Sequence, residues 1–138
     1  SVAADISVSE SDKQYAVSLN RKGEAAYKEK DFNAAINHFQ SAIEINPQYG
    51  QAYSNLGLTF QKTGRVAEAI WANRKAIALA SGSAAATVKA NSYYNNGRIY
   101  EAAGQWNDAL REYQNAKQHK NKQTYDEAIE RMMSKTAN

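Results

Sequence analysis

The sequence predicts an all-α protein built from a repeated helix–turn–helix unit. Apolar residues recur at i, i+3, i+4 and i+7 through most of the chain, which is the spacing of one helix face. In residues 50–79, only Thr63, Gly64 and Arg65 separate two such apolar stripes, and this segment is too short for anything but a tight turn between antiparallel helices. A single proline in 138 residues permits long uninterrupted helices.

The clearest unit spans residues 50–79. Its two apolar stripes are, in chain order, Tyr53, Leu56, Gly57 and Phe60, then Val66, Ala69, Ile70, Ala76 and Ile77. Gly57 lies in the middle of a buried stripe, where glycine costs about 1 kcal/mol relative to alanine. This glycine predicts that a second helix passes so close that a Cβ atom would clash.

The same order of residues occurs on both sides of this unit. The intervals from Gly23 to Gly57 and from Gly57 to Gly97 are 34 and 40 residues. This Gly–aromatic–Ala–aromatic–Ala pattern resembles the tetratricopeptide repeat from about residue 16 to residue 121. The resemblance implies a right-handed superhelical solenoid of three repeats that binds other proteins. The flanking copies are Leu19, Gly23, Tyr27, Phe32, Ala35, Phe39, Ala42 and Pro47 upstream, and Tyr93, Gly97, Tyr100, Gly104, Trp106, Ala109, Tyr113 and Ala116 downstream.

The chain divides into an arm and one repeat domain. Residues 1–10 lack helical periodicity, which predicts a flexible arm, and residues 11–138 form the domain. The repeats are expected at about 16–49, 50–83 and 84–121, followed by a capping helix at about 122–137.

The first repeat has recognisable boundaries. Ser11 and Gln14 have the spacing of a capping box, which predicts a helix from there to about Lys30. The second helix is expected to end near Ile45, because Pro47 disfavours helix at the preceding residue and is suited to starting the next helix.

Six extra residues precede the point, near Ala90, where the third repeat resumes. Their composition predicts nearly two additional turns at the front of the repeat's first helix, with Ser83 as its cap; the alternative is a longer loop. The last helix is amphipathic and has no partner after it, so it is expected to close the apolar flank of the solenoid. Its apolar stripe is Tyr125, Ala128, Ile129, Met132 and Met133.

Composition excludes several classes of function. No apolar run approaches the roughly 20 residues of a membrane span, so no membrane insertion is expected. The chain has no cysteine, a net charge of +3, and single glycines that form no phosphate loop. His38 and His119 lie far apart in sequence on solvated faces, so we predict no enzyme, metal or cofactor. The compartment stays open between the cytoplasm and export after removal of a signal peptide.

In the tetratricopeptide family the first helix of each repeat lines a concave groove, and the resemblance places the peptide-binding residues there. Asn55 and Asn95 occupy equivalent places in their repeats, with Arg21 at that place in repeat one. In the family, asparagines at this place can hold the backbone amides of a peptide; the alternative is that asparagine is simply common there. The expected groove residues are Asn20, Arg21, Gln51, Asn55, Leu58, Lys62, Asn91, Tyr94, Asn95 and Arg98.

The sequence does not match the residue pattern of one subfamily, the chaperone-binding members. They grip a C-terminal carboxylate with a clamp of lysines, asparagines and an arginine. Only Asn55 matches this clamp. Asn20 and Glu24 stand in place of a lysine and an asparagine, and Asn91 and Asn95 in place of a lysine and the arginine. The partner is therefore expected to be a protein or peptide other than a typical chaperone tail.

Trp71 falls where the repeat pattern expects a polar, outward residue, while Asn73 takes a place that is usually aromatic. The favoured prediction is that Trp71 turns inward and compensates for Asn73. The alternative is an exposed contact on the convex face. A self-assembly adaptor that uses this face or the arm is the second hypothesis for function. RNA binding is a third, suggested by nine tyrosines, most of which fall on the packing stripe.

Overall fold

The computed structural model describes residues 7–137, and these residues form helices and connecting turns with no strand. This confirms the all-α prediction. The predicted flexible arm lies mostly outside the described residues. The helices are α1 (Glu10–Lys28), α2 (Phe32–Ile45), α3 (Gly50–Lys62), α4 (Val66–Leu79), α5 (Ala85–Ala102), α6 (Trp106–His119) and α7 (Gln123–Thr136), with a short 3-10 turn η1 (Gly82–Ala84) before α5.

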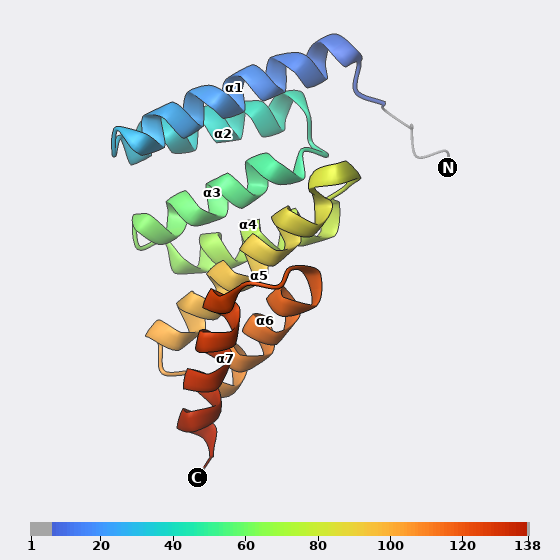
Figure 1. Ribbon diagram of the computed structural model, residues 1–138. Coiled ribbons are helices and arrows are strands. Elements are labelled where there is room, and N and C mark those ends of the chain that lie inside the picture. Colours follow the sequence, from blue (N-terminus) through green and yellow to red (C-terminus); the bar gives the residue numbers. More distant parts are fainter. Residues whose placement is uncertain (1–6, 138) are drawn as a thin grey trace, which may run out of the picture.

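The helices form an elongated stack of antiparallel pairs (Figure 1). The most extensive contacts are within the pairs α1–α2, α3–α4 and α5–α6, and α7 packs on α6. The first helices of successive repeats also contact each other: α1 contacts α3, and α3 contacts α5. The architecture is a helical-repeat solenoid, in which each unit packs mainly on its neighbours.

Mid-helix glycines mark the crossings within each pair. A Cβ atom on Gly97 would lie 2.6 Å from Cε1 of Tyr113, and one on Gly57 would lie 2.8 Å from Cγ of Asn73. The predicted close approach is therefore confirmed. The group that fills the space is mainly a side chain sixteen residues further on, rather than the backbone of the second helix.

The start of α1 differs from the prediction. The helix begins at Glu10, and Oγ of Ser9 accepts a hydrogen bond of 3.1 Å from the backbone N–H of Asp12. The predicted capping box of Ser11 and Gln14 is wrong, because Ser9 supplies the same cap one half-turn earlier and also places Asp12 in the first turn. An acid there is favoured by the helix dipole.

The link between repeats one and two also differs in detail. The α2 helix ends at Ile45 as predicted, but α3 begins at Gly50, three residues after Pro47. Oδ1 of Asn46 accepts a hydrogen bond of 3.2 Å from the N–H of Gln48. Asparagine bonds of this kind stabilise turns, so Pro47 lies in a turn and does not start the helix.

The extra residues before repeat three are helical. The α5 helix has 18 residues, whereas its counterpart α3 has 13, so the helical prediction is confirmed and the loop alternative is wrong. Ser83 is not the cap. It lies inside η1, which begins with Gly82 at φ +72° and leads directly into α5.

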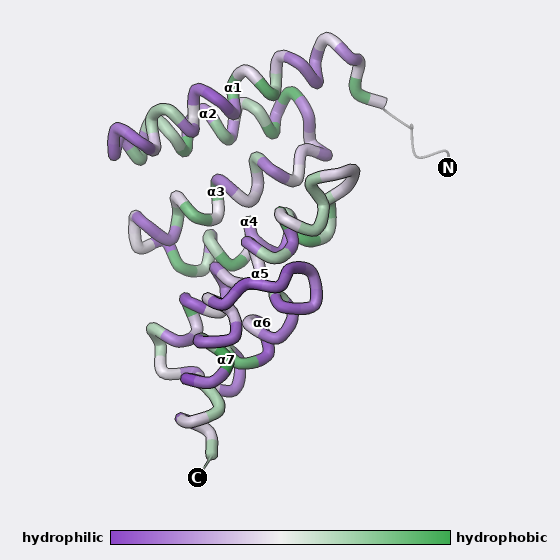
Figure 2. Tube along the Cα trace, in the orientation of Figure 1, coloured by the Kyte–Doolittle hydropathy of each residue, from purple (hydrophilic) through white to green (hydrophobic). Residues whose placement is uncertain are grey.

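The α7 helix closes the last repeat. Tyr125, Ala128 and Met132 are at most 2% exposed, while Met133 at the edge of the predicted stripe is 54% exposed. Both oxygens of Glu101 accept bonds from Arg131 at 2.7 and 2.8 Å, which ties α7 to α5. The link from α6 to α7 is hydrophilic throughout (Figure 2).

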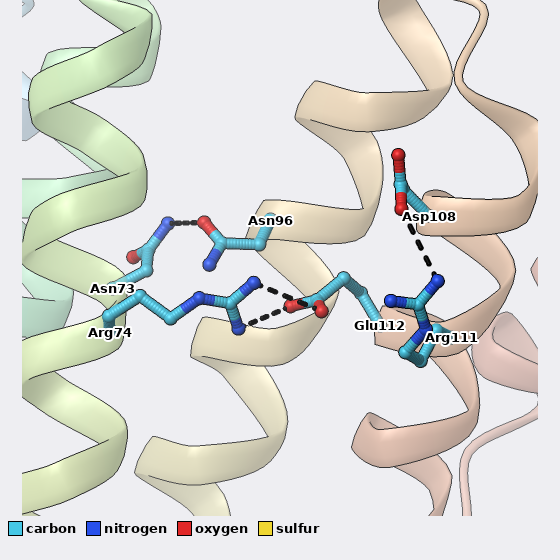
Figure 3. A network of polar contacts seen from close by, with 6 residues as sticks. All are labelled: Asn73, Arg74, Asn96, Asp108, Arg111 and Glu112. Atoms are coloured by element: carbon cyan, nitrogen blue, oxygen red, sulfur yellow. Dashed lines mark hydrogen bonds and ion pairs between the residues drawn. The ribbon is translucent and has the colours of Figure 1, made fainter.

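A polar seam joins α4 to α5 and α6 (Figure 3). Nδ2 of Asn73 donates a hydrogen bond of 2.7 Å to Oδ1 of Asn96, and both side chains are fully buried. Beside them, Arg74 donates two bonds of 2.7 and 3.1 Å to the buried carboxylate of Glu112. Apolar contacts between repeats two and three lie beside this seam, since Ile99 of α5 packs in one cluster with Leu56 and Phe60 of α3.

Candidate functional site

The predicted groove residues all lie on the first helices, but only half of them are exposed. We call the surface formed by these helices the α1–α3–α5 face. Its predicted residues fall into three groups: Arg21, Gln51, Lys62, Asn91 and Arg98 are exposed; Asn55, Leu58 and Tyr94 are half-buried; Asn20 and Asn95 are buried.

Asn55 is held within the protein. Its Nδ2 atom donates a bond of 3.0 Å to Oδ1 of Asn20, and Oε2 of Glu24 lies 3.4 Å from the same nitrogen. Both acceptors come from α1, so the amide donors of Asn55 tie α3 to α1. The expectation that these donors are free for a ligand is wrong.

Asn95 is also less accessible to a ligand than expected, because its side chain is only 8% exposed. Ser92, three residues earlier and therefore on the same helix face, donates a bond of 3.2 Å to Ser54 of α3. This side of α5 is thus part of the contact between helices. The structure does not bring Asn55 and Asn95 together as an open pair of amides.

Tyr94 packs against the capping helix. Its ring lies 5.5 Å from the ring of Tyr113 and 5.3 Å from that of Tyr125, measured between centroids. Such tilted aromatic contacts stabilise the interior. Tyr94 therefore links repeat three to α7 and offers only part of its surface to a ligand.

The exposed part of the face is rich in cations. Arg21, Lys62 and Arg98 form no ion pair with any side chain of residues 7–137. Burial raises the pKa of Tyr27 on α1, and the nearby charge of Arg98 on α5 partly offsets this rise. The charge of Arg98 on α5 thus acts on Tyr27 of α1.

Tyr49 lies at the other end of the face, just before α3. Burial raises the pKa of its hydroxyl, and the carboxylate of Glu24 raises it further, while Asn20 and Arg21 act in the opposite direction. The neighbourhood of Glu24 is thus partly buried and contains one carboxylate among amides and a guanidinium. Sequence patterns give no signal for this cluster, because Tyr49 belongs to a turn.

Trp71 is exposed, so the prediction that it fills the space beside Asn73 is wrong. It is 54% exposed and meets Tyr53 edge-on at 5.7 Å between ring centroids. Asn73 instead contacts Gly57 and bonds to Asn96, which leaves no gap for an indole.

The remaining chemistry of the described residues is sparse. His119 stacks on Tyr93, with parallel rings 5.8 Å apart. Within residues 7–137 no three acidic or histidine side chains gather as a metal site would require. No helix in this range has the length and apolar character needed to cross a membrane.

Comparison with known proteins agrees with this geometry. The sequence profile of the TPR repeat matches residues 23–64. The chain is 28% identical over 117 residues to the mouse protein DnaJ homolog subfamily C member 7, an alignment that covers 83% of this chain and 22% of that protein. It thus spans about a fifth of the length of this curated relative.

Two solved structures are similar in fold. The N-terminal domain of stress-induced protein-1 (STI-1) from C. elegans has a TM-score of 0.80 and 21% identity, covering 90% of this chain and 98% of that one. The first TPR of Spaghetti (RPAP3), bound to the HSP90 peptide SRMEEVD, has a TM-score of 0.80 and 17% identity, with 91% and 96% covered. The chain thus matches the TPR repeat at residues 23–64, and its fold is that of the solved TPR domains.

Proposed function

We propose that the protein is a non-enzymatic adaptor that binds a peptide segment of a partner protein on the α1–α3–α5 face. The observation that carries the proposal is the set of exposed cations Arg21, Lys62 and Arg98, which have no ion partner within residues 7–137. They lie on one face of a fold whose similar member in RPAP3 is described as bound to a peptide. Exposed Gln51 and Asn91 add amide groups that can bond to a peptide backbone.

The ligand we propose is an extended segment with acidic side chains and no requirement for a free C-terminus. The one residue that matches the chaperone-tail clamp, Asn55, bonds to Asn20 and Glu24 instead. A terminal carboxylate at that place would meet the like charge of Glu24, which disfavours binding. Arginines further along the face would pair with acidic side chains, where charge-assisted bonds contribute more than neutral ones.

Site-specific crosslinking tests the location of the ligand. A photoreactive amino acid at Gln51 or Asn91 should crosslink the full chain to one partner, and mass spectrometry should map the same segment of that partner from both positions. The matched control is the same amino acid at Met133, which is equally open to solvent but lies on α7. Equal crosslinking from Met133, or none from the two test positions, would contradict the proposal.

A further inference from the structure

A second surface lies on the opposite side, between the second helices of repeats one and two. An open groove of about 730 Å³ runs between α2 and α4. Its floor is formed by Tyr53, Leu56 and Phe60 of α3, and Trp71 of α4 stands half-exposed on one wall. A large exposed aromatic beside an apolar floor is typical of a protein contact site, where tryptophan often contributes most of the binding energy.

The other wall is polar. It is formed by one face of α2, whose members have the spacing i, i+3, i+4 and i+7: Asn37, Gln40, Ser41 and Glu44. Seven residues of helix rise by about 10 Å, or two turns. A groove of this length, with an apolar floor and polar side chains along its walls, fits an amphipathic helix of two to three turns, since packed helices lie about 8–10 Å apart.

One end of the groove carries a negative charge that no cation of the described residues pairs with. Nε and Nη2 of Arg65 bond both oxygens of Glu68 at 2.8 and 2.7 Å, and Lys75 lies 5.7 Å from the ring of Tyr53. Glu44 is exposed and forms no ion pair with the side chains of residues 7–137. It is therefore the charged group of the lining that is left for a partner.

Helix ends add negative potential near Glu44. The last turns of α2 and α4 contain no basic residue, whereas those of α1, α3, α6 and α7 each contain one or more. The two helices run in the same direction (Figure 1), so the negative ends of both dipoles lie at this end of the groove.

Glu44 also lines a second hollow, of about 1150 Å³. This hollow is lined by Asp12 and by Lys13, whose ammonium lies 3.5 Å from Glu10. A cation of a partner would thus meet the carboxylates of Glu44 and Asp12 near the ends of α2 and α4.

We propose that the α2–α4 groove binds a basic amphipathic helix of a partner protein. An aromatic or long aliphatic side chain of that helix packs against Trp71 and the α3 floor, and a lysine or arginine pairs with Glu44. Trp71 and Glu44 belong to the second helices α4 and α2, whereas the cations Arg21, Lys62 and Arg98 belong to the first helices, so the two proposals rest on different residues.

A displayed peptide library tests both the site and the charge. The library consists of 14-residue helices with apolar residues fixed at i, i+3, i+4 and i+7 and with Lys, Glu, Gln or Ser elsewhere, selected against the full chain. We expect selected helices to contain more Lys than Glu. Their affinity should fall ten-fold or more for Trp71→Ala and three- to ten-fold for Glu44→Gln. The control variant Met133→Ala should leave the affinity unchanged.

Three outcomes would overturn the proposal: no selected helix, an excess of Glu over Lys, or helices that bind Trp71→Ala as well as the parent. Circular dichroism of each variant verifies that the fold is retained. Sedimentation velocity of the chain alone tests a different occupant. Self-association that disappears in Trp71→Ala would assign the groove to a second copy and contradict binding of a partner helix.

Discussion

The side-chain amide of Asn73 donates a hydrogen bond of 2.7 Å to the carbonyl oxygen of Asn96 across the contact between α4 and α5. Oδ1 of Asn73 and Nδ2 of Asn96 have no hydrogen-bond partner within the described part of the chain. Equivalent positions in repeats one and three hold Phe39 and Tyr113, each against a glycine. The contact between repeats two and three thus contains a buried polar pair with two unsatisfied atoms, which lowers stability relative to a fully bonded pair.

Replacing one asparagine should therefore destabilise the protein more than replacing both. Asn73→Ala leaves the buried amide of Asn96 unpaired, which should lower the free energy of unfolding by about 1–3 kcal/mol. The double variant Asn73→Leu with Asn96→Leu removes both polar groups at similar volume and should be neutral or stabilising. Urea unfolding measures both. A double variant less stable than Asn73→Ala would contradict this account of the seam.

The Glu101–Arg131 pair should make stability depend on pH in the acid range. Bonds from Arg131, and then from the hydroxyl of Tyr113, lower the pKa of Glu101 below its ordinary value of 4.5. Its contribution is fully present above pH 4.5 and is lost as the pH falls through the lowered folded-state pKa. Glu101→Gln should therefore lower the melting temperature at pH 7 but change it little at about pH 2. An equal loss at both pH values would contradict this linkage.

Deletion of residues 125–138 should destabilise repeat three. The deletion removes the buried side chains of Tyr125, Ala128 and Met132, and full burial of a large apolar side chain contributes about 1.5–3 kcal/mol. We expect a lower melting temperature and aggregation, measured by calorimetry and light scattering. Met133→Ala is the control and should be nearly neutral because Met133 is exposed. An unchanged melting curve after deletion would refute the capping role of α7.

Trp71→Ala should cost little stability. A tryptophan buried in the core would cost about 3–5 kcal/mol, but Trp71 is half-exposed and has an edge-on contact with Tyr53. We expect a loss of about 1 kcal/mol or less, of the size of an aromatic pair. Guanidinium unfolding decides the question. If the free energy of unfolding fell by more than about 3 kcal/mol, Trp71 would have to be buried in the core, which would contradict this account.

Periodicity was sufficient to predict the helices, the repeat and the cap, because those depend on which face of each helix is apolar. It was not sufficient for choices between neighbouring groups of similar chemistry. Ser9 and Ser11 are both suitable caps, and only the path of the chain selects Ser9.

The exposure of the candidate site residues was predictable for some side chains and not for others. The register correctly placed Arg21, Lys62 and Arg98 on the exposed side of the first helices. The burial of Asn95 depends on how closely α5 approaches α3, and the exposure of Trp71 depends on Asn73 pairing with Asn96. Both are contacts between repeats, which the pattern within one repeat does not contain.

Asn55→Ala is no longer a clean test of ligand binding, since it also removes the bonds to Asn20 and Glu24. The cations are better probes, because they form no ion pair among residues 7–137. The matched control is a pair of lysines, Lys120 and Lys122, in the hydrophilic link between α6 and α7 (Figure 2).

Titration calorimetry with the crosslinked partner segment tests the central claim most directly. Each charge-assisted bond contributes about 1.5–3 kcal/mol, so Arg21→Ala with Arg98→Ala should weaken binding ten-fold or more. Lys120→Ala with Lys122→Ala removes the same charge elsewhere and should weaken it less than three-fold. Equal losses in the two double variants, or undiminished affinity in the first, would place the ligand off the α1–α3–α5 face.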